Sequence, residues 1–186
     1  MARPARIDRT AVLAASLALA DEGGVDAVTM QAVAARLGVT PMALYRHVEN
    51  KRDLLDGVVE RLLDEVPIPP AGTPWQDQLV AMGRGLRSLA RRHPTVFPLL
   101  LQLPAATPAA RRARDRVCEL LEQAGIDAAE SAQLERLIST AVLGFAASEV
   151  SGRFEGQSRA QLDGDFDVLV ELLRTALVAR ATSRPS

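Results

Sequence analysis

The chain has 186 residues, of which 48% are hydrophobic and 24% are charged, so it is long and apolar enough to bury a core, and wholesale disorder is excluded. Its single cysteine excludes an internal disulfide and a CxxC metal site. No run of 18 apolar residues is present and no secretory signal is evident, so we expect a cytoplasmic protein without a transmembrane helix.

Charge is distributed unevenly along a chain whose net charge is −1. Residues 1–52 carry seven arginine and lysine residues against five aspartate and glutamate residues, so the cationic excess lies near the N-terminal end. This mild asymmetry is compatible with a nucleic-acid-binding segment joined to an acidic remainder.

Apolar residues recur with helical spacing along the whole chain, and strand-like alternation is absent, so we expect an all-α fold. Thr29, Thr40 and Asn50 suit helix N-caps, Gly38 suits a helix stop, and Pro41 suits a first helical position. The first four helices are predicted over residues 10–20, 30–37, 41–48 and 51–66.

Four prolines in Pro67–Pro74 predict a stiff linker. Beyond it, helices are predicted over residues 75–92, 109–123, 128–154 and 161–181, with a short apolar segment at 96–103 and a loop at 104–108. We call residues 1–66 the head, 67–74 the linker and 75–186 the body.

The stretch TMQAVAARLGVTPMALYRHVENKRDLL, residues 29–55, predicts a helix–turn–helix over residues 29–48. Ala34 lets the two helices approach closely, and Gly38 stands where a tight turn requires a positive φ. Val33 and Leu44 supply apolar contacts between the helices. A second helix of eight residues is about 12 Å long, which suits a major groove about 12 Å wide.

The outward side chains of this motif have the chemistry of DNA contacts. Arginine pairs with a guanine edge or a phosphate, and methionine or alanine touches a thymine methyl group. Threonine, tyrosine, histidine and lysine donate to phosphate oxygens. Because these types converge on one face, we prefer DNA binding to a merely structural hairpin, with contacts from Thr29, Thr40, Pro41, Met42, Ala43, Tyr45, Arg46, His47 and Lys51.

The segment LYRHVENKRDLLD resembles the signature that closes the DNA-binding head of the tetracycline-repressor (TetR) family of bacterial transcription regulators. Most of the family has phenylalanine after the histidine. This chain has Val48 there, and the tetracycline-repressor branch also has valine. The body resembles the C-terminal domain of that branch at Trp75, Arg92-His93-Pro94, Leu120-Leu121, Ala124-Gly125, Gly144-Phe145 and Glu149.

This resemblance implies an all-helical homodimer that reads a palindromic DNA operator with two heads one helical turn apart, and acts as a repressor. It also implies a body cavity for a small effector whose binding changes the separation of the heads. The branch captures a magnesium–drug complex partly through histidine. The body offers only His93, so we expect neither that metal nor any cofactor.

Apolar body residues are first of all core, but some are expected to line the effector cavity and to select an apolar or amphipathic molecule. These candidates are Met82, Leu86, Leu89, Phe97, Leu101, Leu121, Ile138, Val142 and Phe145. Small residues and an apolar stripe on the last two helices predict the dimer interface, with closure of the monomer core as the alternative. The interface candidates are Ala141, Gly144, Ser148, Leu169, Leu172, Leu173 and Ala176.

Two other functions compete with a regulator. An enzyme is disfavoured because the chain has two histidines, one cysteine and no phosphate-binding glycine loop, and because Glu149 and Glu155 lie off the i,i+4 spacing of one helix face. A helical carrier of apolar ligands with a head that does not bind an operator is the other alternative. DNA binding in a mobility-shift assay separates it from a regulator.

Overall fold

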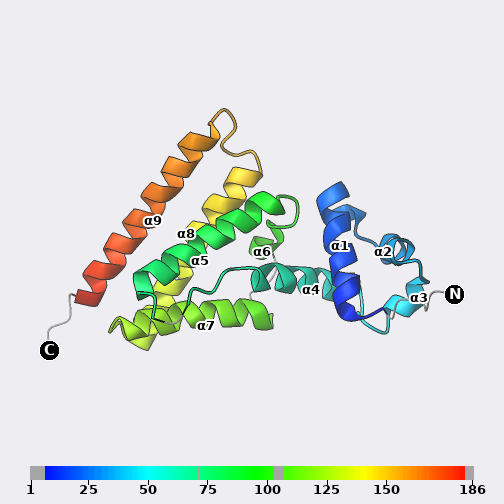
Figure 1. Ribbon diagram of the computed structural model, residues 1–186, viewed down its shortest axis with the longest axis horizontal. Coiled ribbons are helices and arrows are strands. Elements are labelled where there is room, and N and C mark those ends of the chain that lie inside the picture. Colours follow the sequence, from blue (N-terminus) through cyan, green and yellow to red (C-terminus); the bar gives the residue numbers. More distant parts are fainter. Residues whose placement is uncertain (1–6, 71, 103–106, 183–186) are drawn as a thin grey trace.

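The computed structural model describes residues 7–70, 72–102 and 107–182, and these residues form helices and turns with no strand (Figure 1), which confirms the predicted all-α fold. Within those ranges no helix has the length and apolarity needed to cross a bilayer. The elements are α1 (Arg9–Gly23), η1 (Val25–Ala27), α2 (Met30–Leu37), α3 (Pro41–Leu44), α4 (Lys51–Asp64), α5 (Trp75–Arg92), α6 (Leu99–Gln102), α7 (Pro108–Gln123), α8 (Ala128–Val150) and α9 (Arg159–Thr182).

Local capping chemistry begins α2 and α4 as predicted, whereas Thr40 precedes α3 without the predicted side-chain cap. The Thr29 hydroxyl accepts the Ala32 backbone N–H at 3.1 Å, and the Asn50 side chain accepts that of Asp53 at 3.0 Å. Gly38 ends α2 in the left-handed conformation with φ of 67°, which a residue with a side chain adopts only at a cost. The helix–turn–helix is therefore set by its own sequence.

Three predicted helices are shorter than expected, and the one predicted over residues 51–66 ends at Asp64. The helix predicted over residues 41–48 ends at Leu44, and a turn through residues 45–47 follows it, in which the His47 N–H donates to the Leu44 carbonyl three residues earlier at 2.8 Å. The helix predicted over residues 128–154 ends at Val150, since Gly152 turns the chain with a φ of 79°. The predicted loop at 104–108 lies mostly outside the described residues, as does Ala71 of the linker.

Helices α1 to α3 of the head lie at one end of an elongated molecule and the body lies at the other, with α4 of the head between them (Figure 1). Helices α1 to α3 pack on one another, and α1 also contacts α4. In the body, α5, α8 and α9 contact one another, while α7 contacts α4, α5 and α8. Helix α4 is thus the element through which the head touches α7 of the body.

The largest apolar core crosses from the head into the body. Head residues such as Val12 and Leu54 belong to the same buried cluster as Leu89 and Phe97, which lie at and after the end of α5. Two polar contacts strengthen this junction. His93 Nδ1 lies 2.9 Å from an Asp21 carboxylate oxygen, and the Thr95 hydroxyl donates to the Ala20 carbonyl at 2.8 Å.

Candidate nucleic-acid interface and effector cavity

The segment after the Gly38 turn leaves most of its polar side chains, and also Met42, exposed to solvent and buries Leu44 and Val48 in the core. Tyr45 is 52% exposed and Met42 is 74% exposed, whereas Leu44 and Val48 are buried. Among the predicted DNA contacts, those that lie exposed are Thr40, Pro41, Met42, Tyr45, Arg46 and Lys51, and those that lie half-buried are Thr29, Ala43 and His47. The geometry leaves this face open to a partner, and its contact with DNA stays a prediction.

Two cations on this face have no acidic partner. Arg46 and Lys51 are exposed and form no ion pair within the described part of the chain. The nearby Arg36, by contrast, pairs with Glu22 at 2.6 Å. Unpaired exposed cations are the groups that neutralise phosphates on binding to a duplex.

The two threonines predicted to contact phosphate differ in their local bonding. The Thr29 hydroxyl oxygen already accepts the Ala32 N–H with one of its two lone pairs, and its proton stays available to a phosphate. Thr40 precedes α3 but makes no capping hydrogen bond with its side chain. The Thr40 hydroxyl is therefore not used in a helix cap and can both donate and accept a hydrogen bond.

An ion pair that sequence reasoning missed holds the turn between α3 and α4. The Arg9 guanidinium donates to Asp53 Oδ1 at 2.7 Å and to the His47 carbonyl at 2.7 Å, while Asp53 Oδ2 accepts the Glu49 N–H at 2.9 Å. The Arg9 hydrogen bond outweighs desolvation, lowering the pKa of Asp53 and raising that of Arg9. The partners are 44 residues apart, so no local spacing signals them.

The body contains a cavity of about 450 Å³ bordered by α4 to α8. The predicted pocket residues that line it are Met82, Leu86, Leu101, Ile138 and Val142. Helix α4, which begins beside the predicted DNA face, contributes Val59 and Leu63, which sequence reasoning missed. The cavity wall is mostly apolar, as suits a small-molecule site.

Four residues predicted for the pocket do not line this cavity. Leu89 and Phe97 are fully buried in the core that joins head to body. Leu121 packs in a separate cluster with Ile126, and Phe145 lies 5.3 Å from Phe154 between ring centroids. Helical periodicity identifies apolar faces, but it does not distinguish a packed face from one that borders empty space.

Polar groups interrupt the apolar wall along α8. Glu135 is only 6% exposed, and its Oε1 accepts the Ser139 hydroxyl at 2.7 Å. Arg114 and Arg136 also border the cavity, but both side chains are exposed. The wall therefore combines a large apolar surface with one buried carboxylate.

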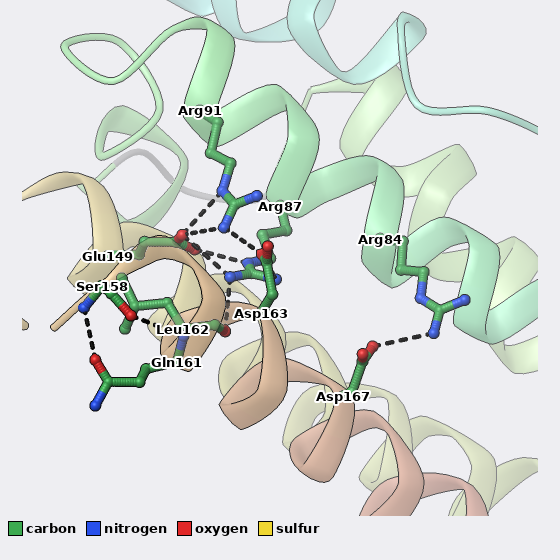
Figure 2. A network of polar contacts seen from close by, with 9 residues as sticks. All are labelled: Arg84, Arg87, Arg91, Glu149, Ser158, Gln161, Leu162, Asp163 and Asp167. Carbon is green, nitrogen blue, oxygen red and sulfur yellow. Dashed lines mark hydrogen bonds and ion pairs between the residues drawn. The ribbon is translucent and has the colours of Figure 1, made fainter.

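A second polar network joins three body helices (Figure 2). Arg87 Nε donates to Glu149 at 2.7 Å, and Arg91 Nη2 donates to Glu149 and to Asp163 at 2.6 Å each. Burial opposes the charge of Glu149, but the hydrogen bonds from both arginines overcome it and lower the Glu149 pKa. Glu149 therefore acts as a tie between α5, α8 and α9.

The residues predicted for a dimer interface divide into two groups. Leu172 is 65% exposed and Ala176 is exposed, and the neighbouring Val168, which the prediction omitted, is exposed as well. Leu169 and Leu173 pack against the apolar cluster around Phe166, so they also close the core of the single chain. The half-buried members are Ala141, Gly144, Ser148, Leu169 and Leu173.

Comparisons with known proteins match both ends of the chain. The family model described as bacterial regulatory proteins, tetR family, matches residues 12–58, and that described as tetracyclin repressor-like, C-terminal domain, matches residues 66–185. The HTH-type transcriptional repressor DrrR1 of Streptomyces coeruleorubidus is 30% identical over 83% of this chain, which spans 58% of that repressor. An uncharacterized HTH-type transcriptional regulator of Mycobacterium tuberculosis, Rv0681, is 30% identical over 98% of this chain and 87% of its own length.

Solved structures of similar fold include a complex with DNA. The crystal structure of Mycobacterium smegmatis BioQ is 27% identical, covers 94% of this chain and 99% of its own, and superposes with a TM-score of 0.80. A structure of BioQ with its double-stranded DNA operator gives a TM-score of 0.77 over the same shares of both chains.

Proposed function

Because this chain belongs to the tetR family of bacterial regulatory proteins, we propose that it is a transcription repressor that binds a palindromic operator and is released from it by a small molecule. The observation that carries the proposal is the exposed segment after Gly38, where Tyr45, Arg46 and Lys51 face solvent and neither cation forms an ion pair with any residue that the structure describes. BioQ, which shares this fold, has been solved with its operator.

In this proposal the head contacts DNA and the body provides dimerisation. Two-fold symmetry of the protein must match two-fold symmetry of the operator, with half-sites one helical turn apart. The exposed apolar residues Val168 and Leu172 on α9 support a helical interface between two copies. Such an interface sets the distance between the two heads.

The effector occupies the cavity between α4 and α8. Helix α4 carries Lys51 at its first position and Val59 and Leu63 on the cavity wall, so a ligand that displaces α4 also displaces the DNA face. Release requires that the ligand bind the DNA-incompetent arrangement more tightly than the DNA-bound one. The cavity walls suit an apolar or amphipathic molecule.

The test is selection of bound sequences from random DNA, followed by mobility-shift assays on the enriched palindrome. Arg46→Ala is expected to cost about 1–3 kcal/mol of binding if Arg46 reads a base, with the loss confined to operators that keep that base. With about six phosphate contacts per dimer, log affinity falls against log salt with a slope near −5. A slope near zero, or no enriched sequence, contradicts the proposal.

A further inference from the structure

Within the described ranges the side chains of Arg87, Glu149 and Glu135 are buried, and only Glu135 lacks an oppositely charged partner. Arg87 is 7% exposed and meets the carboxylates of Glu149 and Asp163. Glu135 is 6% exposed, yet no arginine, lysine or histidine nitrogen of the described residues lies within 4.0 Å of its carboxylate. Its single hydrogen bond comes from the neutral Ser139 hydroxyl, one turn along the same helix.

Such an arrangement gives the Glu135 carboxylate little compensation from the residues that the structure describes. A buried carboxylate loses its hydration, and one neutral hydroxyl replaces only part of it. Oε2 of Glu135 accepts no hydrogen bond from any side chain or backbone group that the structure describes. None of the residues that the structure describes therefore compensates Oε2, which stays accessible at the cavity that Glu135 borders.

We propose that the effector is an amphipathic cation, whose protonated amine or comparable positive group pairs with Glu135 while its apolar part packs against Met82, Leu86 and Val142. This inference rests on the proposed function, because it assigns the chemical class of the ligand to the same cavity. A buried charge pair of this kind is favourable when the carboxylate is already desolvated and preorganised.

The rival ligand is an anion. Arg114 and Arg136 border the same cavity, and Arg136 has no ion-pair partner in the described structure. Both side chains are exposed, so water screens their charge, whereas Glu135 is only 6% exposed and its charge is screened less. Charge placement therefore favours a cation at the buried end of the site.

The experiment compares three probes that share a ten-carbon chain and differ in the head group: decylammonium, decanol and decanoate. Binding to the full chain is measured by titration calorimetry below the micelle concentration. Decylammonium is expected to bind at least tenfold more tightly than decanol, and decanoate most weakly. Glu135→Gln abolishes this preference and leaves decanol binding unchanged. Glu130→Gln, on the same helix but outside the cavity, retains the preference.

Three outcomes overturn the inference. In the first, decanoate binds most tightly and Arg136→Gln loses this binding. In the second, the Glu135→Gln variant still prefers decylammonium. In the third, none of the three probes binds. Removal of an unneutralised buried charge is also expected to raise the midpoint of thermal unfolding of Glu135→Gln. Glu135→Met, apolar and of similar length, gives the same loss of preference if the amide variant does not fold.

Operator binding is measured separately in the absence of probe. A chain that binds its selected operator but shows no preference for decylammonium overturns the ligand class and leaves the repressor intact. A chain that selects no DNA sequence contradicts the proposed function, whatever the probes do. Release of the operator by decylammonium in the wild type, and not in Glu135→Gln, supports both.

Discussion

Arg9 in the first turn of α1 and Asp53 in the first turn of α4 form a paired contact, with Nη2 to Oδ1 at 2.7 Å and Nη1 to Oδ2 at 3.2 Å. The same guanidinium binds the His47 carbonyl, and the same carboxylate binds the Glu49 N–H. The two side chains therefore fix the turn that carries His47 and leads to Lys51. Neither needs to touch DNA to influence how the DNA face is presented.

Asp53→Asn is expected to weaken operator binding about threefold to tenfold, or up to about 1.4 kcal/mol. Removing a negative charge near a phosphate-binding face would by itself strengthen binding, so a loss identifies a positioning role. The measurement is a mobility-shift titration at fixed salt. Glu22→Gln, which breaks the exposed Arg36 pair elsewhere in the head, is the matched control and retains affinity. Unchanged or tighter binding by Asp53→Asn contradicts the positioning role.

The Glu149 network predicts a pH dependence of stability. Hydrogen bonds from Arg87 and Arg91 overcome the effect of burial and lower the Glu149 pKa in the folded state. A lowered pKa stabilises the fold above the unfolded value, about 4.3, and this contribution is lost as pH falls through the folded value. Urea unfolding between pH 6 and pH 3 is expected to show this loss.

Glu149→Gln is the comparison variant for that titration. At pH 6 it is expected to lose about 3 kcal/mol of unfolding free energy, because the buried Arg87 and the half-buried Arg91 both lose their charged partner. Its dependence on pH is weaker than that of the wild type, but not absent, since the pKa of Asp53 and that of Asp163 are also lowered by arginine hydrogen bonds. Parallel curves for the two proteins would show that Glu149 does not contribute.

Features encoded by neighbouring residues were predictable from the sequence. Caps at Thr29 and Asn50 and the left-handed Gly38 depend on contacts within a few residues, so their residue types identify them. The burial of Leu44 and Val48 follows from helical spacing in the same way.

Features encoded by distant residues were not predictable. Arg87 and Glu149 are 62 residues apart, and their pairing depends on how α5 and α8 cross. The exclusion of Phe97 from the cavity depends equally on tertiary packing, since an apolar residue looks the same whether it borders a core or a void. The cavity could be expected from the family resemblance, but its one buried carboxylate could not.

Gly85 in α5 is the position where the linker rests on the body. A Cβ added there would lie 2.4 Å from Cδ of Pro67, a rigid ring, so the linker must shift. Gly85→Ala is expected to destabilise the protein by about 1–3 kcal/mol. On the same helix, a Cβ at Gly83 would meet Val142 at an ordinary 3.8 Å. Gly83→Ala is therefore the control, with a gain of up to about 1 kcal/mol from helix propensity.

Thermal and urea unfolding of the two glycine variants measure this difference. A Gly→Ala change gains helix propensity at both positions. If the two substitutions change the free energy of unfolding in opposite directions, the clash with Pro67 accounts for the difference. Equal stabilisation by both substitutions would mean that the linker is free to leave α5.

Leu172 on α9 provides the sharpest test of the proposed dimer, because it is 65% exposed in the single chain. Leu172→Glu leaves the core of the chain untouched, so its own folding changes by no more than about 0.5 kcal/mol. In a two-fold interface the introduced carboxylate appears twice, once from each copy, in an apolar contact. This disfavours the dimer, so sedimentation is expected to show the monomer mass. Operator affinity then falls, because the second half-site is no longer bound by a tethered head.

Glu171→Gln is the control for that experiment, since Glu171 pairs with Arg174 on its own helix. It is expected to remain dimeric and to bind the operator as the wild type does. Sedimentation at micromolar concentration without DNA decides the outcome. A wild-type monomer, or a Leu172→Glu protein that keeps the dimer mass, removes α9 from the interface, and the spacing of the heads would then have to be set by another surface.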